Sequence, residues 1–351
     1  MNYKNKKVAV ALSGGVDSAV TALLLKNQGC EVLGITGLMV EDRDTPAFIA
    51  GAKKVADAIG IEHFVLDLTC DFKNEVIEYF NNSYKKAQTP NPCGVCNKKI
   101  KWGRIFDYAI NELGCDYFAT GHYADINCHN GVYRLERAAC DNKDQLYFLF
   151  DLTQEQLAKT LFPLGKYSSK DEIRQIAAKN NLPNKSNKDS QGICFIKKPL
   201  SVKKYLLNTL KVTRGKFVNI KTGEVVGKHD GYFQYTIGQR RGIGVSDTYP
   251  LYVCDINPEE NTVYVGYEQD TYSSELKANK VNWQQSEFKD KEFKALAKIR
   301  YNTEAKPCRV LPDKEGFRVL FDEPVFAIAK GQICVIYDED NSFLICGGRI
   351  V

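Results

Sequence analysis

The sequence predicts an α/β protein in which a doubly wound parallel sheet is followed by two small β-rich domains. Residues 7–120 alternate short apolar segments with amphipathic segments of helical length, a pattern typical of parallel sheets. Beyond Leu210 the pattern changes to short β-like segments separated by Gly and Asn or Asp turns. We therefore expect three domains, over residues 1–200, 201–275 and 276–351.

Individual elements follow from the same patterns. The first domain should contain strands at Val8–Leu12, Glu31–Thr36, His63–Leu68 and Asp116–Thr120. Its first helix should end at Asn27. Further helices should lie near Pro46–Ile59, Phe72–Lys86, Ile100–Leu113, Gln154–Leu161 and Lys170–Asn180. An Asn130-Gly131 turn between two alternating segments predicts a β-hairpin. The last domain, with strand-like segments from Ala295 to Ile350, should form a compact barrel.

Composition and charge narrow the class of protein. With 44% hydrophobic and 26% charged residues, the chain is typical of a globular enzyme. After Lys7 a run of only five apolar residues precedes Ser13, and no later run approaches membrane-spanning length. We therefore expect no signal peptide, no membrane partner and a cytoplasmic location. In that compartment the twelve cysteines should be reduced, most of them as small buried hydrophobic residues.

Positive charge is concentrated in residues 170–241, where 16 Lys and Arg accompany 5 Asp and Glu, although the whole chain has a net charge of only +5. A solvated lysine-rich face would account for this segment, and so would a surface that binds a polyanion. The composition leaves both explanations open.

The hexapeptide Ser13-Gly14-Gly15-Val16-Asp17-Ser18 lies between the first predicted strand and the first predicted helix. Two adjacent glycines allow a sharp turn that presents backbone N–H groups to an anion, and the helix N-terminus adds its dipole. The two serines supply hydroxyl donors. An ordinary strand-to-helix turn would also fit this pattern. Gly121-His122-Tyr123 also follows a predicted strand, so both loops should face one crevice.

A second candidate site is the segment Thr89–Asn97, which contains Cys93 and Cys96. We expect Cys96 to open a helix, whose N-terminus would stabilise a thiolate. The basic residues Lys98, Lys99, Lys101 and Arg104 should lower the thiol pKa further. Zinc and thioredoxin-like sites also use Cys-x-x-Cys, although zinc would need two more ligands.

A third segment, Asp189–Ile196, places Cys194 between apolar residues after the polar stretch Asn184–Lys188. By itself this pattern predicts a buried core cysteine.

These segments occur in a characteristic order. It runs Ser-Gly-Gly-Val-Asp-Ser, Thr-Pro-Asn-Pro-x-x-x-Cys-Asn-x-x-Ile-Lys, Ala-Thr-Gly-His-Tyr-Ala, Lys-Asp-Gln-x-Tyr-Phe-Leu, Ser-Gln-Gly-Ile-Cys-Phe-Ile, Tyr-Thr-Ile-Gly-Gln-Arg-Arg-Gly, Ile-Arg-Tyr and Gly-Gln. Together they closely resemble the tRNA-specific 2-thiouridylases, which belong to the PP-loop ATP pyrophosphatases. The resemblance spans essentially the whole chain.

The resemblance implies ATP-dependent 2-thiolation of the wobble uridine in the tRNAs for Lys, Glu and Gln. ATP would adenylate the 2-oxygen of the uracil and release pyrophosphate, and sulfur would replace that oxygen as AMP leaves. Cys194 would carry a persulfide received from a sulfur-relay protein or a cysteine desulfurase. Cys96 would be the nucleophile or partner thiol that closes a transient disulfide with Cys194. The implied cofactors are ATP and Mg²⁺, and the implied nucleic-acid partner is the anticodon arm of tRNA, not DNA.

The resemblance also implies binding residues. Those for ATP are Ala11, Leu12, Ser13, Gly14, Gly15, Val16, Asp17, Ser18, Gly37 and Gly121. Those for tRNA and its flipped target base are Asn91, Pro92, Cys93, His122, Lys143, Asp144, Gln145, Arg300, Tyr301 and Gln332.

Three positions depart from the family pattern. Gly37 stands where the family usually has Met, Leu146 where Ser is common, and Cys93 where Asp is frequent. Cys93, Cys96 and Cys194 could therefore hold a [4Fe–4S] cluster, which would give a different route for the sulfur.

Two more distant functions are compatible with parts of the motif set. One is that of an ATP pyrophosphatase that amidates a small molecule, like GMP synthetase. The other is that of an RNA-binding protein with a relic ATP loop.

Overall fold

The structure is a computed structural model that describes residues 3–185, 192–197 and 199–351. The chain forms two compact units. The first comprises Met1–Val76, Cys93–Gln191 and Asn341–Leu344, and the second comprises Ile77–Pro92, Gly192–Asp340 and Ile345–Val351. Among the described helices, none is long and apolar enough to cross a membrane.

A five-stranded parallel sheet forms the centre of the first unit, as the alternation of strands and helices predicts. Its strand order is β3-β2-β1-β4-β7. The strands are β1 (Lys7–Ala11), β2 (Glu31–Leu38), β3 (Glu62–Asp67), β4 (Tyr117–Ala119) and β7 (Thr160–Leu161). The order reverses at β1, so the loops after β1 and β4 flank a topological switch point, where such sheets bind ligands.

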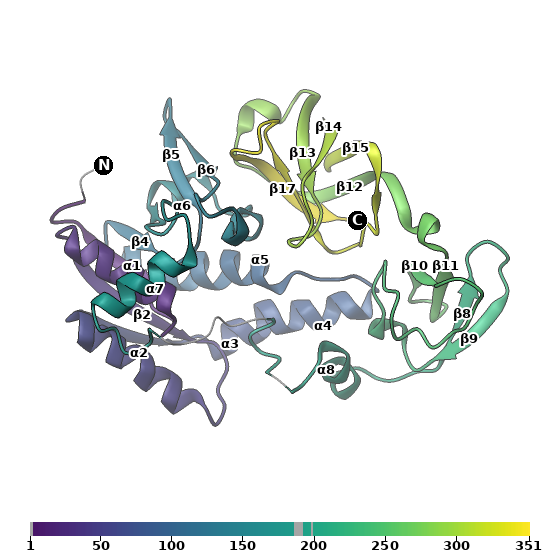
Figure 1. Ribbon diagram of the computed structural model, residues 1–351, viewed down its shortest axis with the longest axis horizontal. Helices are drawn as coiled ribbons and strands as arrows, with labels where there is room; N and C mark the ends of the chain where they lie inside the picture. The colour runs from purple at the N-terminus through teal and green to yellow at the C-terminus, as the bar shows by residue number, and fades with distance from the viewer. Residues whose placement is uncertain (1–2, 186–191, 198) are drawn as a thin grey trace. The chain divides into compact units, whose positions relative to one another are not determined.

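Helices connect these strands (Figure 1). They are α1 (Val16–Asn27), α2 (Thr45–Ile59), α3 (Thr69–Phe72), η1 (Lys73–Ile77), α4 (Glu78–Lys85), α5 (Pro92–Cys96), η2 (Asn97–Ile105), η3 (Tyr108–Glu112), α6 (Gln154–Ala158) and α7 (Lys170–Lys179). Short 3₁₀ turns lie at η4 (Asp141–Lys143) and η5 (Leu146–Phe148). The start and end of α2 are typical, with a proline in the first turn and the left-handed Gly60 (φ 70°) after the last residue.

The helical stretch that carries the Cys-x-x-Cys pair begins earlier than the sequence predicts. Helix α5 starts at Pro92, and η2 and η3 continue the stretch with wide turns. Proline is favoured in the first turn of a helix because it has no N–H to leave unpaired. Cys96, with φ −60° and ψ −43°, therefore lies inside the helix and does not open it. The predicted N-terminal position of Cys96 is wrong.

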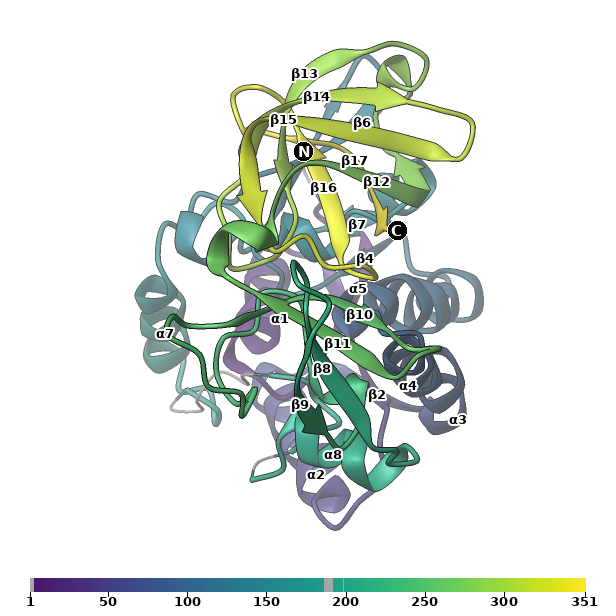
Figure 2. The same cartoon turned by 90° about the vertical axis from the view of Figure 1, so that its right-hand side faces the viewer.

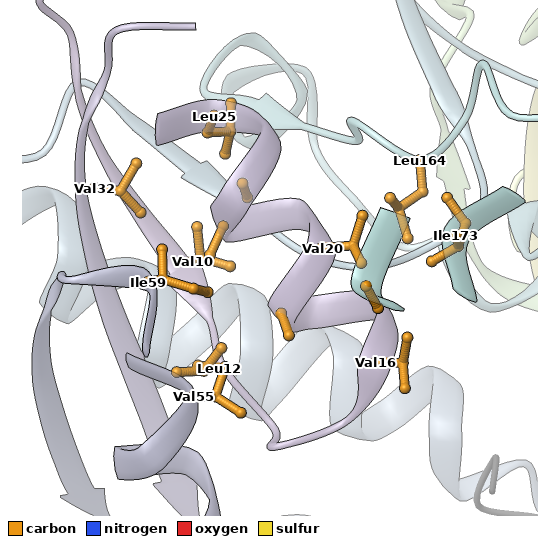
Figure 3. Close-up of a cluster of buried hydrophobic side chains, with 14 of the residues drawn as sticks. Val10, Leu12, Val16, Val20, Leu25, Val32, Val55, Ile59, Leu164 and Ile173 are labelled. Carbon is orange, nitrogen blue, oxygen red and sulfur yellow. The ribbon is translucent and has the colours of Figure 1, made fainter. Parts of the chain in front are cut away.

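The core of the first unit lies around β1 (Figure 3). Val8, Ala9 and Val10 are all fully buried, as expected for a central strand covered on both faces. Val10, Leu12, Val20 and Ile59 belong to one cluster, which also includes Ile173 of α7. Helices α1, α2 and α7 are thereby fixed to the strand that precedes the Ser-Gly-Gly loop.

Trp102 is the largest fully buried side chain of the chain's described part and anchors η2. Its indole Nε1 donates to Thr160 Oγ1 at 2.9 Å, and its ring packs edge-on against Phe118 of β4. We expect Trp102→Ala to lower the free energy of unfolding by about 4 kcal/mol, because it leaves a large cavity and removes the hydrogen bond that the indole donates to Thr160. Denaturant unfolding of the first unit measures this, and a loss below about 1 kcal/mol would contradict it.

The predicted hairpin is also present. Strands β5 (Asp125–His129) and β6 (Val132–Glu136) pair antiparallel across Asn130 and Gly131. Both turn residues have positive φ angles, 50° and 83°, as an Asn-Gly hairpin turn requires.

The second unit is β-rich after the helix α8 (Val202–Thr209), as predicted. One four-stranded sheet has the order β10-β11-β8-β9, and a closed barrel has the order β12-β15-β14-β13-β16-β17 (Figure 2). The strands of the sheet are β8 (Gly215–Asn219), β9 (Val225–His229), β10 (Tyr252–Asn257) and β11 (Thr262–Gly266). Those of the barrel are β12 (Tyr272–Trp283), β13 (Phe293–Lys298), β14 (Lys306–Pro312), β15 (Gly316–Phe326), β16 (Ile333–Tyr337) and β17 (Leu344–Ile350). Short 3₁₀ turns lie at η6 (Tyr232–Gln234), η7 (Glu268–Thr271) and η8 (Ser286–Phe288).

Candidate nucleotide and thiol sites

The loop between β1 and α1 has the geometry of a phosphate cradle. Gly14 has a φ of +73°, which a residue with a side chain adopts only with strain. Gly15 is the N-cap of α1, and having no side chain it leaves the first N–H groups of the helix open to a ligand. The Ser-Gly-Gly sequence therefore folds into the turn that its glycines predict.

The two serines of the loop have different surroundings. Ser18 is 4% exposed, and its hydroxyl accepts from the Ser13 N–H at 3.2 Å and donates to the Gly15 carbonyl at 3.1 Å. Ser13 is exposed, with its Oγ 3.2 Å from Ser18 Oγ. Ser18 thus holds the shape of the loop, whereas Ser13 presents a hydroxyl to a ligand.

Asp17 in the first turn of α1 is held by two side chains from distant parts of the sequence. Lys170 Nζ lies 2.6 Å from both carboxylate oxygens, and the Tyr123 hydroxyl donates to Oδ1 at 2.9 Å. Tyr123 belongs to the predicted crevice loop after β4. Lys170 is a site residue that the sequence reasoning missed. It lies in the predicted α7 and in the basic segment, but no motif distinguishes it from the other lysines.

Gly121 brings the loop after β4 into direct contact with the cradle. A Cβ at this position would lie 2.9 Å from the backbone carbonyl carbon of Asp17 and from the Ser18 nitrogen. The two predicted loops therefore meet at the switch point, as expected from the strand order. Gly37, near the end of β2, is also tightly packed, because an added Cβ would lie 3.0 Å from a methyl group of Ile105.

His122, next to Gly121, is a neutral imidazole of defined tautomer. Lys101 Nζ lies 3.3 Å from Nε2 and can only donate, so Nδ1 carries the proton and donates to Thr120 Oγ1 at 2.7 Å. Desolvation, aided by the positive charge of Lys101, lowers the pKa of His122 well below its usual value. The ring packs beside Trp102, with 5.5 Å between the ring centres. His122 is suited to hydrogen bonding and stacking in this form, and not to proton donation at neutral pH.

The lowered pKa of His122 has a consequence for stability. Because the folded-state pKa is below the unfolded value, the unfolded chain binds the proton more readily, and stability is lost as the pH falls through about 6.5. We expect His122→Gln to flatten the decline in unfolding free energy between about pH 7 and 5, by at most about 1.4 kcal/mol per pH unit. Burial also lowers the pKa values of His63 and His229, but both remain in the variant, so the difference isolates His122. Equal pH slopes in denaturant titrations of the two proteins would contradict this prediction.

The cysteines of the Cys-x-x-Cys pair differ in exposure. Cys93 is exposed and lies in the first turn of α5, whereas Cys96 is buried, with 9% of its surface accessible. Although part of Cys93 is accessible, the protein around its thiol desolvates it and raises its pKa, and the charge of Lys101 opposes this increase. Nearby, Lys98 pairs with the buried carboxylate of Asp151 at 2.8 Å, Lys99 pairs with Glu75, and Arg104 pairs with Asp71. Carboxylates thus neutralise part of the positive potential that the sequence predicts here.

Cys194 is exposed, so the burial that its apolar neighbours predict is wrong. Of those neighbours, Ile196 is buried, and Ile193 and Phe195 are partly buried. Phe195 packs edge-on against Phe80 of α4, with 5.3 Å between ring centres, and Ile193 and Ile196 belong to the same cluster. The segment is thus anchored on both sides of a thiol that faces solvent. Asp189, Ser190 and Gln191 of the predicted motif lie outside the described residues.

Cys96 lies in the first unit and Cys194 in the second. Among the described residues, no group of three or more His, Cys, Asp or Glu side chains is placed to hold a metal ion.

The side chains of two of the three predicted tRNA contacts at 143–145 accept hydrogen bonds from backbone N–H groups. Asp144 is 8% exposed, and its carboxylate accepts from the backbone N–H groups of Ala138 and Leu146. Gln145 Oε1 accepts from the Tyr123 N–H at 3.0 Å. These contacts favour a positioning role for Asp144 and Gln145, whereas Lys143 is partly exposed.

The remaining predicted tRNA contacts lie in the second unit. The backbone N–H of Thr89, two residues before Asn91, donates to the carbonyl of Lys330 at 2.8 Å. Gly331 has no room for a Cβ, which would lie 2.7 Å from Gln88 Cβ. The Thr-Pro-Asn-Pro segment is therefore attached to the barrel beside Gln332. Arg300 donates to the carbonyls of Ile237 and Ala327, and Lys298 Nζ lies over the ring of Tyr301.

Three family models match consecutive parts of the chain. They are described as a tRNA methyl transferase HUP domain (residues 6–198), a tRNA methyl transferase PRC-barrel domain (residues 203–267) and an aminomethyltransferase beta-barrel domain (residues 273–350). A tRNA-specific 2-thiouridylase MnmA from Clostridioides difficile is 41% identical over 99% of both chains. One from Clostridium botulinum is 43% identical and covers 100% of this chain and 99% of its own.

Among solved structures, the chain is similar to the U34-tRNA thiolase NcsA from Methanococcus maripaludis with its [4Fe–4S] cluster. The match has a TM-score of 0.37 and 24% identity, and covers 55% of this chain and 61% of the other. It carries no conclusion about the cofactor of this chain. The family of this chain is shown by the relatives that match it over its full length. With its phosphate cradle at the switch point and its matches from end to end, the chain belongs to the family of tRNA-specific 2-thiouridylases.

Proposed function

We propose that this chain catalyses the ATP-dependent 2-thiolation of the wobble uridine in the tRNAs for Lys, Glu and Gln, with a persulfide on Cys194 as the sulfur carrier. The observation that carries the proposal is the exposure of Cys194 between neighbours that are packed against α4. A structural cysteine in so apolar a sequence would be buried, whereas a thiol that must receive sulfur from a protein and deliver it to RNA has to be accessible.

Activation of the uracil oxygen is assigned to the first unit. The N–H groups at Gly14 and Gly15 and the Ser13 hydroxyl would bind phosphate oxygens, and the backbone of Ala11, Leu12, Gly37 and Gly121 would surround the adenosine. Val16 and Ser18 would hold the loop in shape. The Asp17 carboxylate is suited to Mg²⁺, a hard cation that prefers oxygen ligands and neutralises pyrophosphate.

The transfer of sulfur to the base uses the thiols of Cys194 and Cys96. The terminal sulfur of the Cys194 persulfide attacks C2 of the adenylated uracil, and AMP leaves with the former 2-oxygen. The Cys96 thiolate then attacks Cys194 Sγ and forms a disulfide, while the electron pair of the broken S–S bond remains on the base as the thiocarbonyl. An external thiol reductant must then reduce the Cys96–Cys194 disulfide before the next turnover. This step requires the two cysteines to approach within about 7 Å between Cα atoms.

The tRNA-binding residues divide into two groups. Asn91, Pro92, Cys93 and His122 would surround the flipped uridine, which must leave the base stack for its C2 to be reached. Lys143, Arg300, Tyr301 and Gln332 would contact the anticodon arm, with Asp144 and Gln145 as positioning residues. The basic residues of 170–241 would follow the phosphate backbone.

We also propose that residues 1–200 carry catalysis, that 201–275 link the domains, and that 276–351 contact tRNA. The persulfide donor would be a sulfur-relay protein or a cysteine desulfurase. The chain would work in the cytoplasm, where its tRNA substrates and a reducing thiol pool occur together.

A reconstitution with purified components tests this function. The chain is incubated with ATP, Mg²⁺, a cysteine desulfurase with cysteine, and an unmodified transcript of tRNA for Lys, and the nucleosides are analysed by mass spectrometry. We expect 2-thiouridine, together with tRNA-stimulated release of AMP and pyrophosphate. A methylated uridine, the product that the family-model names would suggest, would contradict the proposal. So would pyrophosphate release with ammonia and a small molecule in place of tRNA.

The [4Fe–4S] route rests on the additional Cys93, and a parallel experiment addresses it. If Cys93, Cys96 and Cys194 hold a cluster, anaerobic reconstitution with iron and sulfide should give an absorbance band at about 400 nm that Cys93→Ala removes. A colourless protein that thiolates tRNA without iron would support the persulfide route.

A further inference from the structure

Lys170 binds Asp17, next to the phosphate cradle, from a distant part of the sequence. Its ammonium group lies 2.6 Å from both oxygens of Asp17, which is 153 residues earlier. The side chain of Lys170 is only 13% exposed. Such a short, bidentate and partly buried pair fixes the first residue of α7 against the first turn of α1.

Helix stability does not explain why a lysine occupies this position. Lys170 is the first residue of α7, where the positive end of the helix dipole opposes a cation. The rest of this first turn follows the usual rule. Ser169 caps it by accepting from the Glu172 N–H, and Asp171 and Glu172 are acidic. We therefore explain the lysine by its contact with Asp17, next to the phosphate cradle.

A second residue, from the turn region that follows α7, reaches the same loop. Asn184 is 5% exposed, and its Nδ2 donates to the Gly14 carbonyl at 2.8 Å. Its Oδ1 is buried and has no hydrogen-bond partner in the part of the chain that the structure describes. Leaving a buried acceptor unpaired is unfavourable, so this oxygen is suited to accept a hydrogen bond from a bound ligand.

We infer that Lys170 is the pyrophosphate-binding cation of the nucleotide site. Its ammonium group neutralises Asp17 when no nucleotide is bound, and transfers to the pyrophosphate portion of ATP when Asp17 is required by Mg²⁺. Lysine is suited to such an exchange because it has a flexible four-carbon stem and a point charge that can change partners. The first turn of α1 keeps the phosphate N–H groups and Asp17 adjacent, so the distance to be moved is short.

This inference rests on the proposed use of ATP, and it explains two features of the fold. It accounts for the packing of Ile173 of α7 into the same core as Val16 and Val20 of α1, because the two helix starts must stay together. It also gives the Asp17 carboxylate, which lies beside an anion-binding loop, a cationic partner.

Titration calorimetry on the full-length chain tests the role of Lys170. We expect Lys170→Met to weaken binding of MgATP and of magnesium pyrophosphate by about tenfold or more, as loss of a charge-assisted contact should. Binding of AMP should change by less than about twofold, because AMP lacks the pyrophosphate portion. Lys170→Arg, which keeps the charge, should retain most of the pyrophosphate affinity. Lys54→Met removes the same charge from an exposed position of α2 and should bind all three ligands like the wild type.

A second measurement should show that the variant responds more strongly to Mg²⁺, which a protein that is only damaged would not do. Since Lys170 competes with Mg²⁺ for Asp17, Lys170→Met should be stabilised against thermal unfolding by lower concentrations of Mg²⁺, without nucleotide, than the wild type. If Lys170→Met does not fold, the calorimetric titration of Lys170→Arg tests the inference by itself. A variant that loses affinity for magnesium pyrophosphate and for AMP to the same extent would overturn the inference.

The outcomes separate the inference from the proposed function. A wild-type chain that binds no ATP would overturn both. A wild-type chain that binds ATP while Lys170→Met retains its full pyrophosphate affinity would overturn only the role of Lys170, which would then be a structural link between α1 and α7.

Discussion

Cys194→Ser and Cys96→Ser should each abolish the formation of 2-thiouridine, by about 10³-fold or more, the scale on which enzymes lose activity when a covalent nucleophile is removed. The reasons differ. Without the Cys194 thiol no persulfide forms, because a serine hydroxyl cannot carry the sulfur. Without Cys96 the sulfur attached to the base has no thiol to release it from Cys194. Nucleoside analysis of the modified tRNA measures both losses.

The two variants should also differ from each other. The Cys96→Ser protein should still accept labelled sulfur from the desulfurase, whereas Cys194→Ser should accept none. Adenylation uses neither thiol, so tRNA-dependent pyrophosphate release should persist in both. Cys128→Ser is a matched control, since Cys128 is exposed on the β5 hairpin and lies in no predicted site. Product formation by Cys194→Ser with wild-type yield would contradict the persulfide route.

Cys93→Ser distinguishes the two routes for sulfur in the same assay. Under the persulfide route Cys93 only contributes to the pocket of the target base, so we expect a decrease of less than about tenfold, equivalent to about 1.4 kcal/mol. Under the cluster route the loss should be complete, because three protein ligands are needed to hold the iron.

The fold of the first unit could be predicted because its signals are local. Val8, Ala9 and Val10 form a short apolar run with a Gly-Gly turn soon after it, and that pattern is sufficient to locate a central strand and the helix that follows. The Asn130-Gly131 hairpin is equally local. The start of the Cys96 helix was not predicted correctly, because two prolines suggest an extended segment until Pro92 is recognised as the first residue of the helix.

The candidate site depended on contacts that no sequence pattern contains. The cradle follows from its glycines, but the pairing of Asp17 with Lys170 joins residues 153 positions apart. Asn184 contacts Gly14 in the same way, over 170 positions. The exposure of Cys194 is a tertiary effect, because Ile193, Phe195 and Ile196 find a common cluster and the cysteine between them does not. Similarly, the charge of Asp144 suggests a surface contact until its carboxylate is found buried against two backbone N–H groups.

Gly121→Ala should weaken ATP binding strongly although it adds only one methyl group. The new Cβ would lie 2.9 Å from backbone and Cβ atoms of Asp17 and from the Ser18 nitrogen. Backbone atoms at the start of a helix cannot move aside individually, so the first turn of α1 must shift, and with it the N–H groups and the Asp17 carboxylate of the cradle. We expect at least about a tenfold loss of MgATP affinity by calorimetry, and about 1–3 kcal/mol lower stability from overpacking.

The matched control for this substitution is Gly51→Ala in α2. Nothing lies within 4 Å of the position that its Cβ would occupy, and it is an interior helix position where alanine is favoured over glycine by about 0.5–1 kcal/mol. This variant should bind ATP like the wild type and be equally or more stable. If Gly121→Ala also binds ATP with wild-type affinity, the loop after β4 is not part of the nucleotide site, and the adenosine contacts assigned to it must be sought elsewhere. If only Gly121→Ala loses affinity, the Gly121-His122-Tyr123 loop is part of the nucleotide site. His122 then lies beside the ATP that activates the uracil oxygen.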